Sequence, residues 1–378
     1  MRPVRSEDQE FFRETTARFL DEFMSPPSVR ALREDPVGFD PEYWRRGAEL
    51  GWVSFLVSED NGGGSISGLG LVDLTLVAHE FGMHAAAGPL VGSNLVAKAL
   101  SDASSQPDAL GEIVGGAVAG WCYAEPIPND ALGTVTTTVT VDGGDVVVSG
   151  VKRPVESANV AECFLVTGRT GEGLTQVLVP AGTPGVSIKA LRSVDLTRRF
   201  FTVTFDGVRL PASAVVGEVG GAAEAVERQM EVANVVANAE AVGAMQKGFD
   251  ITHEWAFDRY SFGRPLSSYQ ALKHRYADMK LWLEASHAVN DAAAEALAVA
   301  PGELSTSELV SVASSYIGDK GVDLLQDCVQ LHGGLGVTYE HDIHLYLRRQ
   351  ALNRTLFGTP GEHRLRIADI AEQRGDVA

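Results

Sequence analysis

The chain has 378 residues, of which 45% are hydrophobic and 21% charged, so it holds ample apolar material for a core and exceeds the usual size of one domain. Its 31 Lys and Arg residues face 50 Asp and Glu residues, and the net charge of -19 disfavours binding to a polyanion such as DNA. Three dispersed cysteines without a CxxC pair exclude a disulfide framework and a zinc ribbon, and fit a reducing compartment. Neither a signal-like apolar start nor an apolar run near the ~20 residues of a membrane span occurs. We therefore expect a cytoplasmic protein of two or three domains with no membrane segment.

Residues 1–118 form the first predicted domain, which is helical. Apolar residues recur at partly helical spacing in residues 11–23, and Pro41 suits the first turn of a second helix. Residues 61–64 read Asn-Gly-Gly-Gly and must form a loop. This loop lacks the GxGxxG order and a preceding strand, and the chain contains no GxxxxGK[ST] motif, so we interpret it as a surface turn rather than a nucleotide loop.

Residues 119–222 form the second predicted domain, which consists of short strands. Residues 134–152 are rich in β-branched side chains, and the Asp-Gly-Gly at 142–144 separates two apolar runs in the manner of a hairpin. Further strand-like runs follow at short intervals, separated by Gly and Pro. This pattern predicts an antiparallel β-barrel or sandwich.

Residues 223–378 form the third predicted domain, which is helical again. Residues 225–263 contain no proline and can form one extended helix. In the next helix, Leu272, Tyr276, Met279 and Leu283 recur at spacings of four, three and four, as in the seam of a helical bundle. The overall expectation is an α+β chain that ends in a four-helix bundle. His341 and His344 have no acidic or thiol partner at matching spacing, so no metal site is expected.

Two C-terminal segments carry a family resemblance. Residues 258–279 read DRYSFGRPLSSYQALKHRYADM and residues 330–349 read QLHGGLGVTYEHDIHLYLRR; both resemble elements of the acyl-CoA dehydrogenase family of flavoproteins. Further landmarks occur in family order as ELGW at 49–52, AEP at 124–126, GVK at 150–152 and VRLP at 208–211. The resemblance covers essentially the whole chain and implies an acyl-CoA dehydrogenase fold with FAD as the cofactor.

The resemblance implies that the ADP half of FAD is held by the C-terminal domain of a neighbouring subunit, and the matching residues are intact here. Arg259 can neutralise a pyrophosphate with a fork of donors, and glycines without a Cβ let backbone N–H groups approach a phosphate. The alternative is a helix end and a turn whose Gly and Arg residues only pack. The implied cofactor contacts are Arg259, Ser261, Phe262, Gln270, Gln330, His332, Gly333 and Gly334.

The flavin-ring side departs from the family pattern. A Thr-Glu-Pro motif is replaced by Ala124-Glu125-Pro126, and Asp130 stands where the family has a serine. The Lys-x-Trp-Ile-[ST] run becomes residues 152–156, with Pro154 in place of the aromatic wall and Glu156 in place of the hydroxyl. An Asp near a pyrophosphate would repel it, and Ala124 cannot donate a hydrogen bond. We therefore expect this chain to hold a flavin ring poorly in its own middle domain.

The glutamate that serves as catalytic base in the family is missing at both of its usual positions, so no catalytic residue is expected here. One position holds Phe357, and the other holds Ala233, followed by Asn234 where the family often has arginine. Glu240 is a rival base on nearly the same helix face as Ala233, but seven residues displace it by ~10.5 Å. Glu231 is nearer in sequence but points in another direction. We interpret both as ordinary surface acids.

These features predict the base-less subunit of a heteromeric, FAD-dependent acyl-CoA dehydrogenase, similar to actinobacterial α2β2 pairs that often act on CoA thioesters of steroid side chains. The partner would be a homologous subunit that carries the catalytic Glu and binds the acyl-CoA, and an electron-transfer-flavoprotein-like acceptor would reoxidise the flavin. Two alternatives stay open: a homomeric dehydrogenase with Glu240 as a relocated base, and a non-enzymatic scaffold that has lost flavin.

Overall fold

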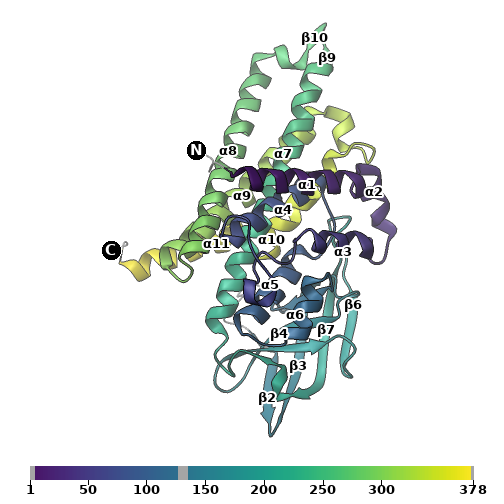
Figure 1. Ribbon diagram of the computed structural model, residues 1–378. Helices are drawn as coiled ribbons and strands as arrows, with labels where there is room; N and C mark the ends of the chain where they lie inside the picture. The colour runs from purple at the N-terminus through teal and green to yellow at the C-terminus, as the bar shows by residue number, and fades with distance from the viewer. Residues whose placement is uncertain (1–4, 127–134, 376–378) are drawn as a thin grey trace.

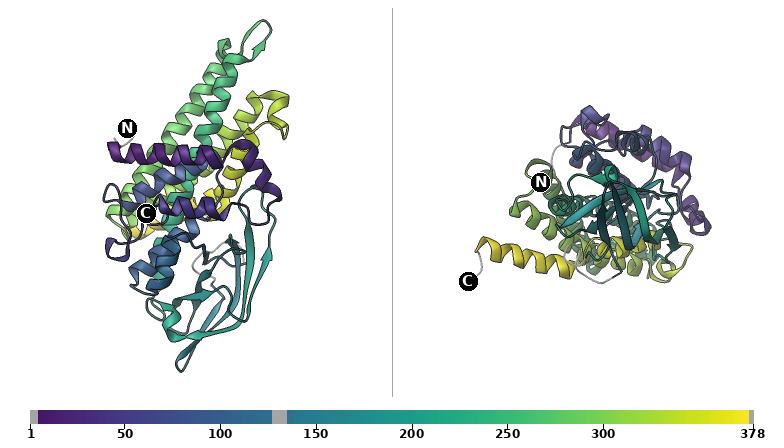
Figure 2. Two further views of the ribbon diagram at one scale, coloured as in Figure 1. Left: turned by 45° about the vertical axis from the view of Figure 1, so that its right-hand side comes forward. Right: turned by 90° about the horizontal axis from the view of Figure 1, so that it is seen from below.

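The computed structural model describes residues 5–126 and 135–375. A long central helix, α7 (Ala223–Asp258), runs through the molecule and contacts all of its parts. The N-terminal helices lie on one side of α7, the sheet lies around its first half, and the remaining C-terminal helices pack along it (Figure 1). The C-terminal end of α7 and the N-terminal end of the next helix, α8 (Gln270–Val299), project together beyond the body of the protein (Figure 2).

The N-terminal region is helical, as predicted. Ser6 and Gln9 form a capping box that begins α1, and Asp40 caps α3 ahead of Pro41. The predicted loop begins where a short 3-10 turn (Glu59–Asn61) ends at Gly62, whose φ of +83° favours glycine. The helices are α1 (Glu7–Phe23), α2 (Pro26–Ala31), α3 (Pro41–Glu49), α4 (Gly70–His84), α5 (Leu90–Asp102) and α6 (Pro107–Val114).

The middle region is an eight-stranded sheet with the order β6-β7-β3-β2-β4-β5-β8, and β1 pairs with β4 at its side. The predicted hairpin at 142–144 joins β2 to β3. The sheet is mainly antiparallel, as predicted, and the sequence analysis did not anticipate that β4 pairs in parallel with β1 and, at one residue pair, with β2. The strands are β1 (Ala119–Cys122), β2 (Thr138–Asp142), β3 (Asp145–Glu156), β4 (Cys163–Arg169), β5 (Leu174–Pro180), β6 (Val186–Ala190), β7 (Phe200–Pro211) and β8 (Val215–Val216).

The C-terminal region is built on α7, which forms one helix of 36 residues. The described residues of this region form a helical bundle, as predicted, with three helices of 28 to 36 residues and two of 14 and 15 residues, and a small hairpin lies between the first two helices. After α7, these elements are β9 (Tyr260–Ser261), β10 (Arg264–Pro265), α8 (Gln270–Val299), α9 (Leu304–Leu331), the 3-10 turn η5 (Gly333–Val337), α10 (Ile343–Leu356) and α11 (Pro360–Arg374).

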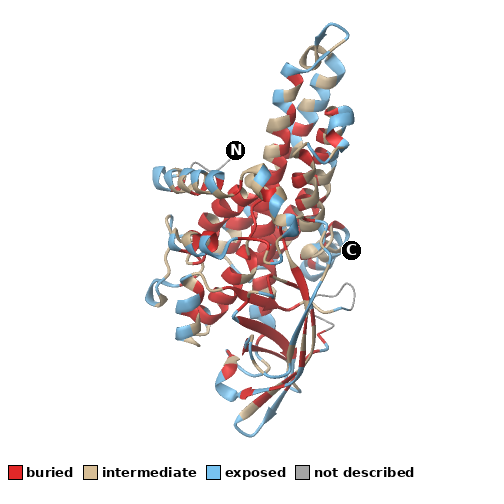
Figure 3. Cartoon of the chain, turned by 90° about the vertical axis from the view of Figure 1, so that its right-hand side faces the viewer, coloured by how far each residue is buried: buried red, intermediate tan, exposed pale blue. Residues whose placement is uncertain are grey.

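Helices α4 and α7 cross with their backbones in close contact. A Cβ on Gly82 would lie 1.9 Å from the carbonyl oxygen of Glu240, and one on Gly243 would lie 2.0 Å from that of His79. Glycine is therefore required at both positions. The crossing ties the N-terminal and C-terminal regions into one hydrophobic core that also includes the inner face of the sheet, and buried residues are concentrated there (Figure 3). None of the helices in the described ranges is both long and apolar enough to cross a membrane.

Candidate functional site

A cleft of about 830 Å³ opens between the sheet, the first half of α7, the start of α9 and the turn between α10 and α11. Tyr123 and Pro154 line it from the sheet side, and Asn234, Ser311 and Phe357 line it from the helical side. Polar and apolar side chains alternate around this space, and its volume suits a bound organic molecule. The cleft is therefore the candidate active-site region of this chain.

Phe357, one of the two positions at which the family places its base, lines this cleft, and Ala233, the other position, directly precedes Asn234 of the lining. Asn234 Nδ2 donates a hydrogen bond of 3.3 Å to the carbonyl oxygen of Phe357, which joins α7 to the turn after α10. Ala233 is fully buried and Phe357 is 9% exposed, with its ring 6.0 Å from that of Trp121. The structure thus brings both sequence positions together, and neither supplies a carboxylate.

Glu231 also lines the cleft, which the sequence analysis missed. It is only 2% exposed, so its interpretation as a surface acid is wrong. Its carboxylate accepts a hydrogen bond of 2.5 Å from Ser307 Oγ, and Arg228 and Arg366 lie 2.7 and 3.2 Å away. Burial raises the pKa of Glu231, against the opposing effects of Ser307 and the two arginines. A signal was present in its spacing of three residues from Asn234, which places both on one helix face.

Glu240 is likewise buried, at 6% exposure, and its interpretation as a surface acid is also wrong. Its carboxylate lies 3.2 Å from Arg198 Nη1 and 2.5 Å from Arg349 Nη1, and it accepts a further bond of 3.0 Å from Asn353. Asp195 pairs with the same Arg349 at 2.5 Å. Glu240 is absent from the lining of the cleft, and its oxygens are occupied by this network of charges.

The two glutamates in the segments that correspond to the family's flavin-ring motifs differ in position. Glu125 lies beside the cleft but accepts bonds from Lys152 Nζ at 2.8 Å and from the backbone N–H groups of Thr136 and Thr137. Burial would raise the pKa of Glu125, but Lys152 and Thr136 hold it at about 2. Glu156 does not line the cleft as expected, because both its oxygens accept bonds from Arg198, at 2.5 and 2.7 Å.

Pro154 does line the cleft, at the position where the family has an aromatic wall. Asp130 lies outside the described residues. The sheet side of this cleft therefore presents a proline and an ion-paired glutamate, and Ala124 adds no hydrogen-bond donor from its side chain.

Arg259, Ser261 and Phe262 lie at the opposite end of α7, on the β9–β10 hairpin. The side chain of Phe262 is 97% exposed, and its φ of +50° is a left-handed conformation that a bulky residue rarely adopts. Phe262 therefore does not contribute to the hydrophobic core, and the local backbone conformation does not favour a phenylalanine at this position. Strained, exposed residues of this kind mark contacts with a ligand or partner.

The loop after α9 lies beside this hairpin. The His332 ring stacks on Trp255 at 5.4 Å, and the Arg259 guanidinium lies 5.9 Å from the centre of the same indole. Trp255 thus joins the two predicted cofactor-contact segments, and sequence analysis missed it although it stands one helical turn before Arg259. His332 is buried, and its Nδ1 lies 2.8 Å from the carbonyl oxygen of Cys328.

The remaining predicted contacts lie at exposed positions. Gln270 begins α8 and Gln330 is the second-last residue of α9, and both are exposed. A Cβ added to Gly333 or Gly334 would meet no atom within 4 Å, so their backbone is open to an approaching group. His341 packs against His332, and His344 packs against Tyr339.

The hairpin and the cleft of one chain are far apart. Asn234 at the cleft and Asp258 before the hairpin lie on the same unbroken helix, 24 residues apart, which corresponds to about 36 Å along its axis. An extended dinucleotide does not reach across this distance. A cofactor bound in this cleft would therefore lie away from the hairpin of the same chain.

Comparison with known proteins identifies the family. Residues 6–107, 124–208 and 220–371 match the N-terminal, middle and C-terminal domain families of acyl-CoA dehydrogenases. The acyl-CoA dehydrogenase IpdE2 of Mycolicibacterium smegmatis is 30% identical over 366 residues, covering 96% of this chain and 98% of the relative. The chain belongs to the acyl-CoA dehydrogenase family.

Solved structures of this family share the fold. A variant of a steroid acyl-CoA dehydrogenase, whose name joins Tcur3481 and Tcur3483, superposes with a TM-score of 0.88 at 24% identity and covers 98% of this chain and 99% of its own. Glutaryl-CoA dehydrogenase from Mycobacterium smegmatis, solved with FADH2, superposes with a TM-score of 0.87 at 21% identity, covering 99% and 96%. The three-part architecture of this acyl-CoA dehydrogenase family member is therefore that of its relatives.

Proposed function

We propose that this chain is the base-less subunit of a heteromeric, FAD-dependent acyl-CoA dehydrogenase. The observation that carries the proposal is the hydrogen bond from Asn234, the neighbour of Ala233, to Phe357, because it links the two base positions of the family where neither holds a carboxylate. Abstraction of the α-proton of a thioester needs a positioned base, typically worth about 10²–10⁴ in rate. A homologous partner subunit would supply that base and the acyl-CoA site.

The C-terminal end of α7 is this chain's proposed contribution. The residues that fit the ADP half of FAD are Arg259 and Ser261 on the hairpin and the open backbone of Gly333 and Gly334. Bound FAD would accept the hydride that leaves the β-carbon of the thioester. Because the hairpin lies about 36 Å along α7 from its own cleft, it would serve the FAD in the cleft of the partner.

The exposed apolar side chains around the hairpin support a partner at this end. Tyr260 and Phe262 on the hairpin and Val337 and Tyr339 on the neighbouring loop are all exposed. Several exposed apolar side chains at one end of a molecule are typical of a surface that contacts another protein. We propose an α2β2 assembly, with an electron-transfer-flavoprotein-like acceptor. A steroid side-chain thioester is the proposed substrate class, supported by the steroid acyl-CoA dehydrogenase among the structural relatives.

A second candidate is a homomeric dehydrogenase in which Glu231 is the base. Glu231 lies in the cleft and its pKa is raised, so it suits the role of base better than Glu240. The oxygens of Glu240 are bound by two arginines and Asn353. Against it, Ser307 and Arg366 already bond the Glu231 carboxylate. A scaffold that has lost flavin is the third alternative. Glu231→Gln separates the first two, because it should abolish turnover only if Glu231 is the base.

The test of the main proposal is Arg259→Ala in the complex with the partner subunit. Loss of a charge-assisted contact with the pyrophosphate should weaken FAD retention roughly ten- to hundredfold while the complex still assembles. Flavin absorbance after ultrafiltration measures this. Arg264→Ala, on the same hairpin, is the matched control, because Arg264 packs 3.9 Å over the Tyr269 ring and should leave FAD bound. Full flavin retention by Arg259→Ala would contradict the proposal and favour the scaffold.

A further inference from the structure

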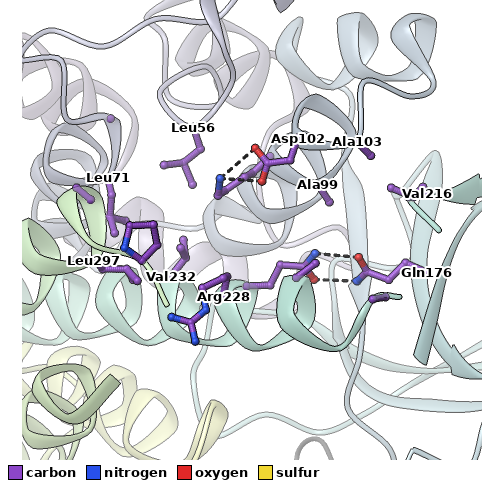
Figure 4. A pocket seen from close by; sticks show the side chains of 18 of the residues that line it. Leu56, Leu71, Ala99, Asp102, Ala103, Gln176, Val216, Arg228, Val232 and Leu297 are labelled. Atoms are coloured by element: carbon purple, nitrogen blue, oxygen red, sulfur yellow. Dashed lines mark hydrogen bonds and ion pairs between the residues drawn. The ribbon is translucent and has the colours of Figure 1, made fainter. Parts of the chain in front are cut away.

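A second cavity, of about 580 Å³, lies on another face of α7 than the cleft. Figure 4 shows the side chains that line it. On α7, Gln229 and Val232 face the cavity, whereas Met230 and Asn234 line the cleft. The two spaces are therefore separated by the helix itself. The proposed dehydrogenase function leaves this cavity unused.

The walls of the cavity come from all three regions of the chain. Leu56 and Leu71 belong to the N-terminal region, Val216 belongs to the sheet, and Val232 and Leu297 belong to α7 and α8. Sites for small molecules are common at such junctions, and their usual volumes of about 300–1,000 Å³ include this one. The position and the size of the cavity are those of a ligand site.

Small side chains keep the cavity open. Ala99 and Ala103 line it at the end of α5, and Ala225 and Ala298 line it from α7 and α8. A larger aliphatic residue at any of these positions would fill part of the space. Apolar walls bind water only weakly. An apolar ligand can therefore occupy a cavity of this kind readily.

The two side-chain amides in the walls are bonded to one another. Gln176 and Gln229 pair their amides at 2.8 and 2.9 Å, and Trp121 Nε1 donates to Gln229 Oε1 at 3.0 Å. At the rim, Lys98 Nζ lies 2.8 Å from Asp102 Oδ2, and Figure 4 shows both of these pairs. A charged ligand loses its hydrating water when it enters the cavity. The walls could replace these hydrogen bonds only by breaking one of the pairs above, so binding of a charged ligand costs free energy.

We propose that this cavity binds an uncharged molecule that consists mainly of hydrocarbon, at a site distinct from the cleft. The apolar walls disfavour an ionic ligand in the interior. The amides of Gln176 and Gln229 already bond to each other and offer such a ligand no hydrogen bond. Asp102 and Glu218 would repel a carboxylate, and the two cations of the lining are already paired, Lys98 with Asp102 and Arg228 with Glu231 at 2.7 Å. The ligand is held by burial of apolar surface between the three regions.

The first test titrates the full-length chain with straight-chain alcohols from hexanol to dodecanol, followed by calorimetry. Affinity should rise about fourfold for each added methylene and level off once the chain fills the cavity. Dodecanoate should bind at least about tenfold more weakly than dodecanol, because its charge loses hydration. Tighter binding of dodecanoate would overturn the assignment to an uncharged ligand, and absence of saturable alcohol binding would overturn the site.

The second test fills the cavity. Ala298→Phe places a ring in it from α8, and dodecanol affinity should fall at least about tenfold. Ala292→Phe, at an exposed position on the same helix outside the lining, is the matched control and should bind like the unaltered chain. If thermal unfolding shows that Ala298→Phe is unfolded, Ala225→Phe replaces it, since Ala225 is exposed in the first turn of α7. Unchanged affinity in a folded cavity-filling variant would overturn the proposal.

Discussion

Glu231 and Glu240 show how far the role of an acidic residue depends on what surrounds it. Both lie on α7 and both are buried. Glu231 faces the cleft, whereas Glu240 is held between Arg198 and Arg349 at the junction of α7, α10 and the loop before β7. Burial of charges is tolerated here because each carboxylate has a cationic partner. Their different surroundings give them different expected responses to mutation.

Glu240→Gln should destabilise the chain without removing a catalytic group. The substitution leaves Arg198 and Arg349 with one fewer buried counter-charge, at a cost of roughly 3 kcal/mol of unfolding free energy. Urea unfolding measures the loss, and turnover per folded complex should stay nearly unchanged. Glu254→Gln, at an exposed position on the same helix, should change stability by less than about 0.5 kcal/mol. A hundredfold loss of turnover with normal stability would instead identify Glu240 as the base.

His363 should make stability depend on pH. Its ring is buried beside the cleft, and burial together with Arg366 lowers its pKa from 6.5 to about 4. Between these values the unfolded chain binds a proton that the folded chain does not, so stability falls as pH drops from 6.5 towards 4, by about 3 kcal/mol in total.

The measurement is denaturant unfolding across this pH range. His363→Gln cannot take up the proton and should flatten the profile, whereas the exposed His253→Gln should leave it as it was. An equally steep profile in His363→Gln would show that other groups cause the pH dependence.

At the scale of elements, α7 is the part of the fold that the sequence predicted best. An extended helix without proline follows from residues 225–263, and the structure confirms it over Ala223–Asp258. The charge network around Glu240 could not be predicted, because its members are separated by as many as 154 residues and none carries a local signal of burial. The parallel pairing of β1 with β4 could not be predicted either, because the two strands are more than 40 residues apart and no local pattern indicates which strands pair.

The crossing of α4 and α7 should tolerate no side chain at Gly243. In Gly243→Ala the added Cβ would meet the His79 carbonyl oxygen at 2.0 Å, which is backbone and can move only if the helices separate. We expect a loss of at least about 2 kcal/mol of unfolding free energy, measured in urea. The control is Gly111→Ala in α6, where a Cβ meets nothing within 4 Å and should stabilise by ~0.5–1 kcal/mol. A neutral Gly243→Ala would mean that the helices are packed less closely than described.

At the scale of the whole molecule, the hairpin proposed to contact the cofactor lies at one end of α7 and the cleft lies along the first half of this helix. The sequence pointed to both sets of residues, but it could not show that they are about 36 Å apart along one helix. It also could not show that Trp255 links Arg259 to the loop at His332. Both results depend on the length and straight course of α7 rather than on any motif.

The proposed assembly should contain one FAD for every two chains. If only the partner's cleft holds a flavin ring, a four-chain complex with two copies of each subunit binds two FAD molecules, as the two-fold pairing of unlike subunits requires. Flavin absorbance per mole of purified complex measures the ratio, and a cofactor-saturated homomeric family member is the control with one FAD per chain. A ratio near one FAD per chain in this complex would favour the homomeric reading with Glu231 as the base.

The distance between hairpin and cleft has a consequence for the unassembled subunit. A chain made in excess of its partner would present only the hairpin side of a cofactor site, which cannot enclose an isoalloxazine ring. Under the proposed function, such an orphan subunit would hold no reduced flavin that oxygen could reach. Unequal synthesis of the two subunits would then waste polypeptide without generating hydrogen peroxide, so redox activity would appear only in the completed complex.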